Sequence, residues 1–274
     1  FGDGYRSLLL SDVAGNYSFL KISTAIWKIK YVNLFANFKD IRGDYKDYWH
    51  FKDKYGTFHY LSWNLTKWFN AGLFESVIWQ AKDTLNNRGF DPNYLNLVIF
   101  FRPIEYSLGS ADNSLMGLNF KFKITNKIQL YSQIILDEFL LKEVRAKNGW
   151  WANKYGGQIG FKYFDAFGAK GLYLQAEFNE VRPYTYSHGS TLQNYAHYNQ
   201  PLAHPLGANF SEMLGIIRYD KKNFSVELKS IVSKYGADSA GKNFGGDIYM
   251  PYTSVVQIYG NKTGQGIANY LMVN

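Results

Sequence analysis

Polar and apolar side chains alternate along this chain at the spacing of a β-strand. From Leu118 to Ile124, apolar residues take every second position, with asparagine and lysine between them. Successive side chains of a strand point to opposite faces of a sheet, so a period of two predicts a strand with one apolar and one polar face. The pattern returns over residues 31–38, 128–137, 154–163, 172–179 and 224–229. It predicts an antiparallel all-β fold of about ten to twelve strands.

The expected connections between these strands alternate between two lengths. Short turns are expected near 28, 66–70, 125–127, 165–171 and 220–223, and longer segments near 39–56, 80–113, 138–153, 182–210 and 234–253. Short periplasmic turns and long extracellular loops are typical of outer-membrane β-barrels. Aromatic residues also cluster beside the short turns, where an interfacial girdle would place them: Trp68, Phe69, Phe164, Phe167, Tyr219 and Phe224.

A soluble β-sandwich is the main alternative, because its strands alternate in the same way. Its loops do not usually follow two strict lengths, and long loops without structure are uncommon in compact domains. Aromatic residues make up 19% of the chain, yet the mean hydropathy is only −0.29. That combination fits strands that face lipid on one side and water on the other. We therefore predict a single transmembrane β-barrel domain of the outer-membrane type over residues 1–274, incomplete at both ends and part of a larger barrel.

Several function classes find no support in the sequence. The chain has no cysteine, which excludes disulfides, thiolate metal sites and a cysteine nucleophile. We find no catalytic motif and expect no enzyme activity, no catalytic residue and no cofactor. The net charge is +8, but the basic residues are spread along the chain, so we expect no nucleic-acid binding. Anionic lipopolysaccharide, together with outer-membrane lipid, is the expected electrostatic partner.

The segment from Arg182 to Asn209 is the richest candidate for ligand binding. Aromatic faces can stack on sugar rings while planar polar groups bind hydroxyls, and binding residues often lie on loops held by a rigid scaffold. The candidates here are Arg182, Tyr184, Tyr186, His188, Gln193, Asn194, Tyr195, His197, Tyr198, Asn199, Gln200 and His204. The alternative is an ordered loop folded into the barrel mouth, with its side chains satisfying backbone groups.

Two further features of the loops leave alternatives open. Trp150 and Trp151 either form a stacking platform for a sugar or partner, or anchor the aromatic belt or pack within the loop. Three of the five histidines, His188, His197 and His204, lie in the Arg182–Asn209 segment. No two of them have the i, i+4 spacing of a metal-binding pair on a helix, and no cluster of acidic residues accompanies them, so we expect no metal site.

Several longer motifs resemble one family. Gly2–Leu8, Asn87–Phe90, Gly149–Gly156 and the run from Arg182 through Gln200 to Asn209 are similar to the Wzi-like capsule-assembly outer-membrane barrels, and most of all to RemB-type gliding-motility surface proteins of Bacteroidota. The resemblance covers almost the whole chain. It implies an outer-membrane barrel with polysaccharide attachment in the capsule branch, and with surface adhesion or gliding machinery in the motility branch.

These observations lead to a hypothesis and two rivals. We expect a non-enzymatic barrel in the bacterial outer membrane, acting in gliding motility or adhesion through long loops on the cell exterior. Its partners would be surface or capsular polysaccharide, or other outer-membrane proteins of a motility or secretion complex. The rivals are an outer-membrane lectin that anchors capsule, and a passive pore or structural subunit of such a complex.

Overall fold

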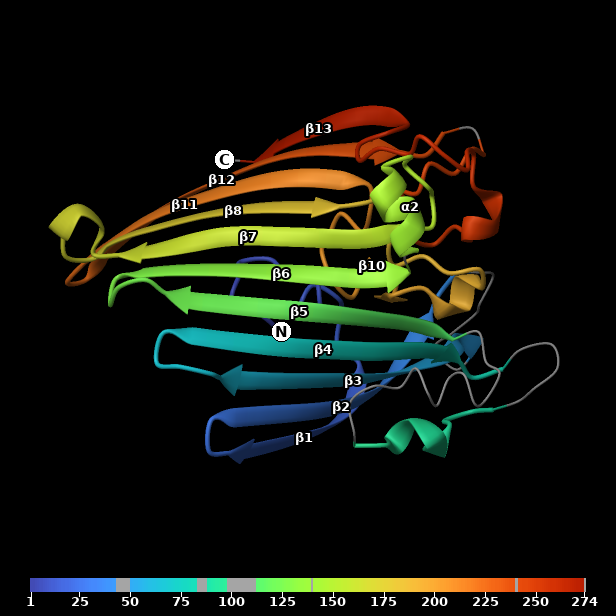
Figure 1. Cartoon of the computed structure of the whole chain (residues 1–274), viewed down its shortest axis with the longest axis horizontal. Helices are drawn as coiled ribbons and strands as arrows, with labels where there is room; N and C mark the ends of the chain where they lie inside the picture. Colours follow the sequence, from blue (N-terminus) through green and yellow to red (C-terminus); the bar gives the residue numbers. More distant parts are fainter. Residues whose placement is uncertain (43–49, 83–87, 98–111, 139, 240, 274) are drawn as a thin grey trace.

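A computed structural model describes residues 1–42, 50–82, 88–97, 112–138, 140–239 and 241–273 of the chain (Figure 1). Eleven strands form one antiparallel sheet. They are β1 (Ser18–Ile26), β2 (Ile29–Asp40), β3 (Lys52–Asn64), β4 (Phe69–Gln80), β5 (Asn113–Lys123), β6 (Ile128–Glu138), β7 (Lys154–Phe164), β8 (Leu172–Val181), β11 (Phe210–Lys221), β12 (Phe224–Ala237) and β13 (Ile267–Val273).

The remaining elements are short. A separate two-stranded ribbon pairs β9 (Ala196–His197) with β10 (Gln200–Pro201). The helical segments are α2 (Leu141–Ala146) and the 3-10 helices η2 (Pro92–Leu95), η3 (Ala166–Gly168), η4 (Thr191–Gln193) and η5 (Tyr252–Ser254). In the described part of the chain, no helix has the length and apolar character needed to cross a membrane.

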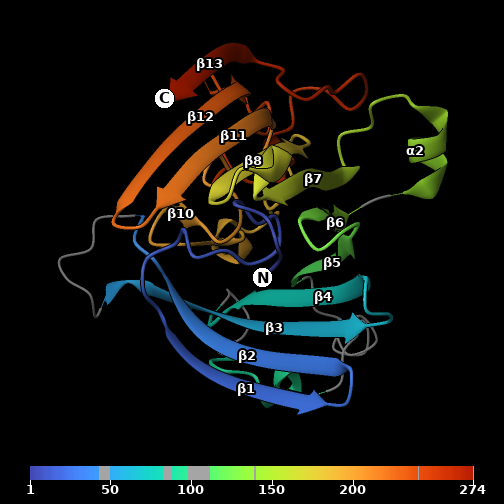
Figure 2. The same ribbon diagram turned by 90° about the vertical axis from the view of Figure 1, so that its left-hand side faces the viewer.

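Each strand of the large sheet pairs with its neighbours in chain order, so the sheet is a meander. The order runs β1-β2-β3-β4-β5-β6-β7-β8-β11-β12-β13, and β1 and β13 form its two edges. The sheet curves strongly but does not close within the described residues (Figure 2). The predicted antiparallel all-β fold and the number of strands are confirmed, whereas closure into a barrel stays a prediction.

The predicted alternation of connection lengths is also confirmed. Short turns at one end of the sheet alternate with long connections at the other end (Figure 1). The long connections are 41–51, 81–112, 139–153, 182–209 and 238–266. We call these two regions the short-turn end and the loop end. Since hairpins join neighbours in a meander, the ends of the strands are the only places where long insertions fit without breaking the sheet.

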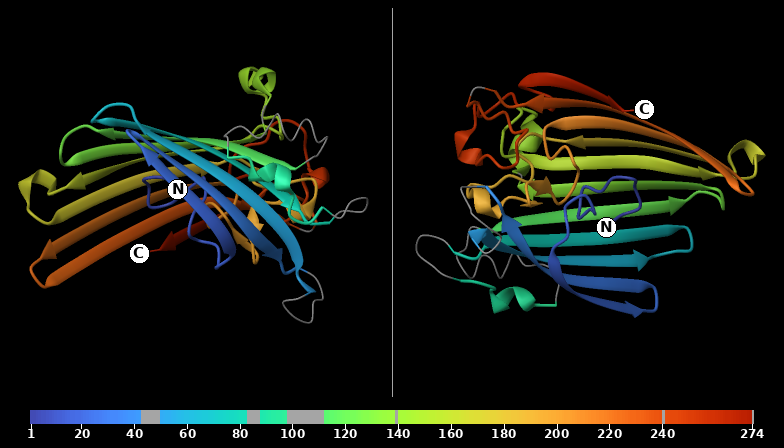
Figure 3. Two further views of the ribbon diagram at one scale, coloured as in Figure 1. Left: turned by 90° about the horizontal axis from the view of Figure 1, so that it is seen from below. Right: turned by 180° about the vertical axis from the view of Figure 1, so that it is seen from behind.

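Over most of the sheet, the apolar face is exposed. Ile159, Met213 and Leu228 are 63%, 64% and 57% exposed on β7, β11 and β12. The N-terminal segment lies within the curve of the sheet (Figure 3). Gln158 contacts that segment, so alternation along the strand places Ile159 on the opposite, convex face. Soluble proteins bury such residues, and large exposed apolar areas mark contact with a membrane or another protein.

Polar side chains lie on the opposite, concave face and are buried. Six of them, directly opposite one another across neighbouring strands, form a continuous line that we call the polar row. None is more than 3% exposed. Its members are Asn119, Gln133, Gln158, Asn179, Glu212 and Ser233. Hydrogen bonds join neighbours in the row, including Gln158 Nε2 to Asn179 Oδ1 at 2.8 Å and Ser233 Oγ to Glu212 Oε2 at 3.2 Å.

The N-terminal segment, residues 1–11, covers the polar row. The backbone N–H of Leu8 donates to Gln133 Oε1 at 2.8 Å, and Gln158 Nε2 donates to the carbonyl of Arg6 at 3.0 Å. The N–H groups of Tyr5 and Arg6 donate to the two carboxylate oxygens of Glu177 at 2.7 and 3.0 Å. An irregular segment cannot satisfy its own backbone, so these side chains take the place of a neighbouring strand.

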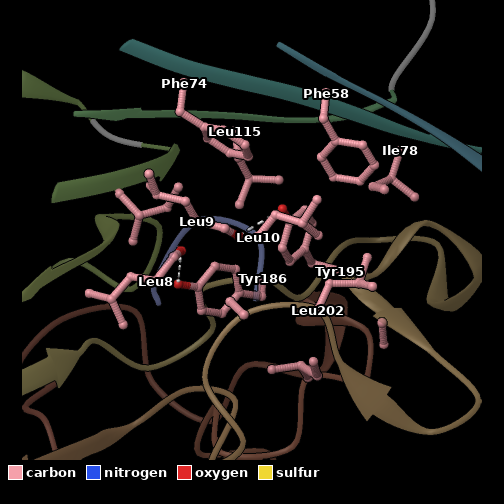
Figure 4. Close-up of a cluster of buried hydrophobic side chains, with 14 of the residues drawn as sticks. Leu8, Leu9, Leu10, Phe58, Phe74, Ile78, Leu115, Tyr186, Tyr195 and Leu202 are labelled. Carbon is pink, nitrogen blue, oxygen red and sulfur yellow. Dashed lines mark hydrogen bonds between the residues drawn. The ribbon is translucent and has the colours of Figure 1, made fainter. Parts of the chain in front are cut away.

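Beyond the polar row, the same segment enters an apolar core towards the loop end. Leu8, Leu9 and Leu10 are at most 5% exposed, and they pack with aromatic and aliphatic side chains from the sheet and from the 182–209 connection (Figure 4). The partners from the sheet include Phe58, Phe74, Ile78 and Leu115. The N-terminal segment thus joins the sheet to the 182–209 connection.

The sheet near its first edge departs from the general pattern. On β2, the predicted apolar positions Leu34, Ala36 and Phe38 lie in the concave core rather than on the exposed face. The opposite face of β3 and β4 is covered by the chain itself, because Tyr94 from the 88–97 segment is buried against Val77 and Trp79. The exposed apolar side chains of the sheet therefore lie mainly on β6 through β12, and on β1 at the edge.

Replacing Leu9 with alanine tests the role of the N-terminal segment as core. Loss of a fully buried leucine should lower the free energy of unfolding by about 2–5 kcal/mol, because the surrounding side chains leave a cavity. Urea unfolding in detergent micelles measures this. Leu228→Ala is the control, since that side chain is 57% exposed and should change stability far less. Equal effects of the two substitutions would contradict the assignment.

Candidate functional site

The 182–209 connection folds inward over the loop end and is held by two buried lysines. Lys54 Nζ donates to the backbone carbonyl of Asn194 at 2.6 Å. Lys154 Nζ lies 3.0 Å from Asp137 Oδ1 and donates to the carbonyl of Ser187 at 3.2 Å. Both lysines are at most 1% exposed. Because a buried ammonium needs several oxygens around it, each lysine fixes one part of the connection to the sheet.

Two stacked tyrosines fix the same connection to the N-terminal segment. The ring centroids of Tyr186 and Tyr195 are 5.5 Å apart, and their hydroxyls donate to the carbonyls of Leu8 and Leu9 at 2.7 and 2.8 Å (Figure 4). Burial raises the pKa of both phenols well above the usual value, so both stay protonated as donors. Both rings are therefore part of the buried core.

The three histidines of this connection also face protein groups. His197 Nδ1 accepts from the N–H of Lys39 at 3.0 Å, and His204 Nε2 lies 2.9 Å from Glu212 Oε1. His188 Nδ1 accepts from the N–H of Ser190 at 3.2 Å, and burial lowers the pKa of His188 to about 4. Within the described ranges, no group of three His, Cys, Asp or Glu side chains is placed to hold a metal ion.

The sequence-predicted site residues therefore divide into two groups by exposure. The buried group is Tyr184, Tyr186, His188, Gln193, Asn194, Tyr195, His197 and His204. The group with exposed or half-buried side chains is Trp150, Trp151, Arg182, Tyr198, Asn199 and Gln200. The buried residues agree with the alternative of an ordered loop whose side chains contact other protein groups. A ligand can reach only the second group without displacing the connection.

A pocket of about 300 Å³ opens at the loop end beside Arg182. Its walls come from α2 and the residues after it, from the start of β7, from Arg182 directly after β8, and from residues 260–262 of the last connection. The lining residues are Glu143, Val144, Lys147, Asn148, Gly149, Asn153, Tyr155, Arg182, Gly260, Asn261 and Lys262. Small-molecule sites begin at about this volume.

Backbone pairing between two distant connections builds the pocket. The N–H of Asn261 donates to the carbonyl of Gly149 at 2.9 Å, and the N–H of Gly260 donates to the carbonyl of Asn148 at 2.8 Å. Gly149 has a φ of +67°, and a Cβ there would lie 2.8 Å from the backbone nitrogen of Asn261. Glycine is required because any side chain would push the two connections apart.

Arg182 lies at the base of the pocket and connects it to the predicted tryptophans. Its Nε donates to the carbonyl of Asn153 at 2.8 Å, and its Nη2 to that of Trp150 at 3.4 Å. The guanidinium carbon lies 5.4 Å from the ring centroid of Tyr155. Trp151 instead packs against Tyr184 and Tyr252, with centroid distances of 5.8 and 5.2 Å, which favours a loop-packing role.

The pocket is polar and carries a positive charge. Lys147, Arg182 and Lys262 outnumber its one carboxylate, Glu143, which hydrogen-bonds to Asn148. Among the described residues, neither Lys147 nor Lys262 has a carboxylate within 4.0 Å. An aromatic ring, planar amides and free cations together suit a hydroxylated ligand that also bears negative charge.

Of the residues that line the pocket, sequence reasoning found Arg182 and missed the others. Lys147, Asn148, Tyr155 and Lys262 lie on three separate connections or strands, and no local motif links them. Neither a family model nor a curated protein matches this chain. The site is therefore defined by its geometry.

Replacing Lys154 with methionine tests the anchoring of the 182–209 connection. The substitution leaves the buried carboxylate of Asp137 without its cation, a change that costs about 3–5 kcal/mol. Chymotrypsin should then cleave after Tyr184, Tyr186 and Tyr195 at least tenfold faster, as peptide mapping by mass spectrometry would show. Lys142→Met, at an exposed position of α2, is the matched control. Unchanged cleavage in Lys154→Met would show that the lysine is not an anchor.

Proposed function

We propose that this chain forms wall strands of an outer-membrane β-barrel that acts at the cell surface in gliding motility, adhesion or capsule assembly. The observation that carries the proposal is the inverted placement of side chains on β6 through β12. Ile159, Met213 and Leu228 are exposed on the convex face, while Gln158, Asn179 and Glu212 are buried on the concave face. Lipid satisfies such an exposed apolar face without any further protein.

The alternation of connections supports a defined orientation. In outer-membrane barrels the short turns face the periplasm and the long loops face the exterior. The long connections of this chain all lie at one end of the sheet (Figure 1). In that orientation the pocket beside Arg182 would open to the cell exterior, where surface polysaccharide is found.

Binding of surface or capsular polysaccharide through the pocket is the activity that the geometry supports best. Tyr155 offers a ring face, Asn148 offers a planar amide, and Lys147 and Lys262 offer free charge. The resemblance to Wzi-like and RemB-type proteins agrees with this activity. A lectin that anchors capsule is the second candidate favoured by the same pocket. A passive pore is less favoured, because the N-terminal segment occupies the concave face.

Reconstitution tests the membrane part of the proposal. We expect the purified chain to aggregate in plain buffer but to insert into phosphatidylcholine vesicles with a strand-rich circular dichroism spectrum. Insertion should protect the strands from added protease, because their convex apolar face would be in lipid. A monomeric, folded chain in buffer without detergent would overturn the proposal.

Substitution of the two free pocket lysines tests the binding part. Lys147→Gln combined with Lys262→Gln should weaken binding of acidic surface polysaccharide at least tenfold, because each lysine can form a charge-assisted hydrogen bond with a carboxylate. A glycan array, followed by titration of the best ligand, measures the effect. Lys142→Gln combined with Lys242→Gln removes the same charge at the loop end outside the pocket and should leave binding unchanged. Equal binding by all three proteins would exclude the pocket.

A further inference from the structure

Lysines are repeated at the short-turn end of the sheet. We define the basic rim as residues 27–28, 65–68, 123–127, 165–171 and 220–223, which comprise the five short turns and the last residues of β5 and β11. Every one of these turns carries at least one lysine, and all of these lysines are exposed. They are Lys28, Lys67, Lys123, Lys127, Lys170, Lys221 and Lys222. The turns lie together at one end of the sheet in both side views (Figures 1 and 3).

The charge of the rim is largely uncompensated. Its acidic residues are Asp165 and Asp220, so seven lysines and two aspartates give a net charge of +5 out of the +8 of the whole chain. Lys127 lies 3.6 Å from Asp165, and Asp220 pairs with Arg218 at 3.0 Å. Among the described residues, the other six lysines have no carboxylate within 4.0 Å. Several like charges gathered in this way attract a polyanionic surface.

Exposed aromatic side chains accompany the lysines. Trp27, Trp68 and Phe167 are 81%, 56% and 82% exposed, which is unusual for residues of this size. Lys28 Nζ lies 4.9 Å from the centroid of the Trp27 ring. Tryptophan and lysine side by side suit the boundary between hydrocarbon and headgroups, where the ring lies in the apolar layer and the ammonium reaches outward.

The apolar surface continues directly from the rim. Phe224, Val226 and Leu228 are 61%, 50% and 57% exposed on the convex face of β12, starting at the last short turn. A soluble acidic protein or free anion would satisfy the lysines but leave this surface in water. A phospholipid satisfies both, because its phosphate and its acyl chains lie at adjacent depths.

We infer that the basic rim binds anionic phospholipid headgroups of the membrane leaflet that the short turns meet. The inference rests on the proposed membrane location. In the proposed orientation this leaflet is the periplasmic one, opposite the lipopolysaccharide that the net charge of the sequence first suggested as the partner. Most of the excess positive charge therefore serves to fix the depth and orientation of the barrel from the periplasmic side.

Lipid selectivity measured from tryptophan fluorescence tests the inference. The chain is reconstituted into vesicles that contain brominated phosphatidylglycerol or brominated phosphatidylcholine, whose bromines quench Trp27 and Trp68. We expect phosphatidylglycerol to associate with the chain about fivefold more strongly than phosphatidylcholine does. This factor corresponds to about 1 kcal/mol, the typical attraction of one lysine to an anionic membrane surface. The preference should fall to about one in roughly 0.5 M NaCl, because that salt shortens the Debye length to a few ångströms.

Two matched triple variants make the test specific. Lys67→Gln, Lys170→Gln and Lys222→Gln together should remove most of the preference, whereas Lys52→Gln, Lys142→Gln and Lys242→Gln remove the same charge at the loop end and should leave it intact. Equal association of both lipids with the unmodified chain would overturn the inference, as would equal losses in the two variants. Suppression of the preference by about 10 mM inorganic phosphate, too little salt to screen a membrane surface strongly, would assign the rim to a free anion instead.

The outcomes separate this inference from the proposed function. A chain that inserts into phosphatidylcholine vesicles but shows no lipid preference keeps its membrane role and loses only the lipid-binding rim. A chain that fails to insert into any vesicle overturns both. Because the six substituted lysines are all exposed, loss of folding is not expected, and circular dichroism of each variant verifies this.

Discussion

The hydrogen bonds between the polar row and the N-terminal segment hold this structure together. Six polar side chains from six strands form a line of buried donors and acceptors. Two of them, Gln133 and Gln158, hydrogen-bond to the backbone of the irregular N-terminal segment. Without that segment, the hydrogen-bonding groups of the row would be left without partners or would bind water. Without the row the segment would have no place for its own N–H and carbonyl groups.

The rest of the architecture follows from this contact. The segment carries Leu8 and Leu9 towards the loop end, where their carbonyls accept from Tyr186 and Tyr195. Those tyrosines belong to the connection that Lys54 and Lys154 hold from the opposite side. The sheet, its first residues and the 182–209 connection therefore form a single packed unit. The pocket beside Arg182, in the outer part of the loop end, stays open to a ligand.

The fold was largely predictable because it depends on local pattern. Alternation places Leu130 and Ile134 on one face and Gln133 on the other whatever their neighbours are, and a turn is short or long by its residue count alone. The candidate site was only partly predictable. The aromatic and polar residues of 182–209 looked like a binding surface, but the same residue types also satisfy a buried backbone. Whether Tyr186 or His204 contacts ligand or core depends on the path of the chain in space.

The sequence by itself determined the strands, their number, their two-faced character and the alternation of their connections, since each depends on residues close together in the chain. Tertiary structure alone decided which face of the sheet is covered, because that depends on residues 1–11 crossing strands more than a hundred positions away. Tertiary structure also decided which residues come together in the pocket and in the basic rim. Lys147 and Lys262, like the lysines of the five short turns, become neighbours only when the strands between them have paired, and charge acts through distance in space rather than distance along the chain.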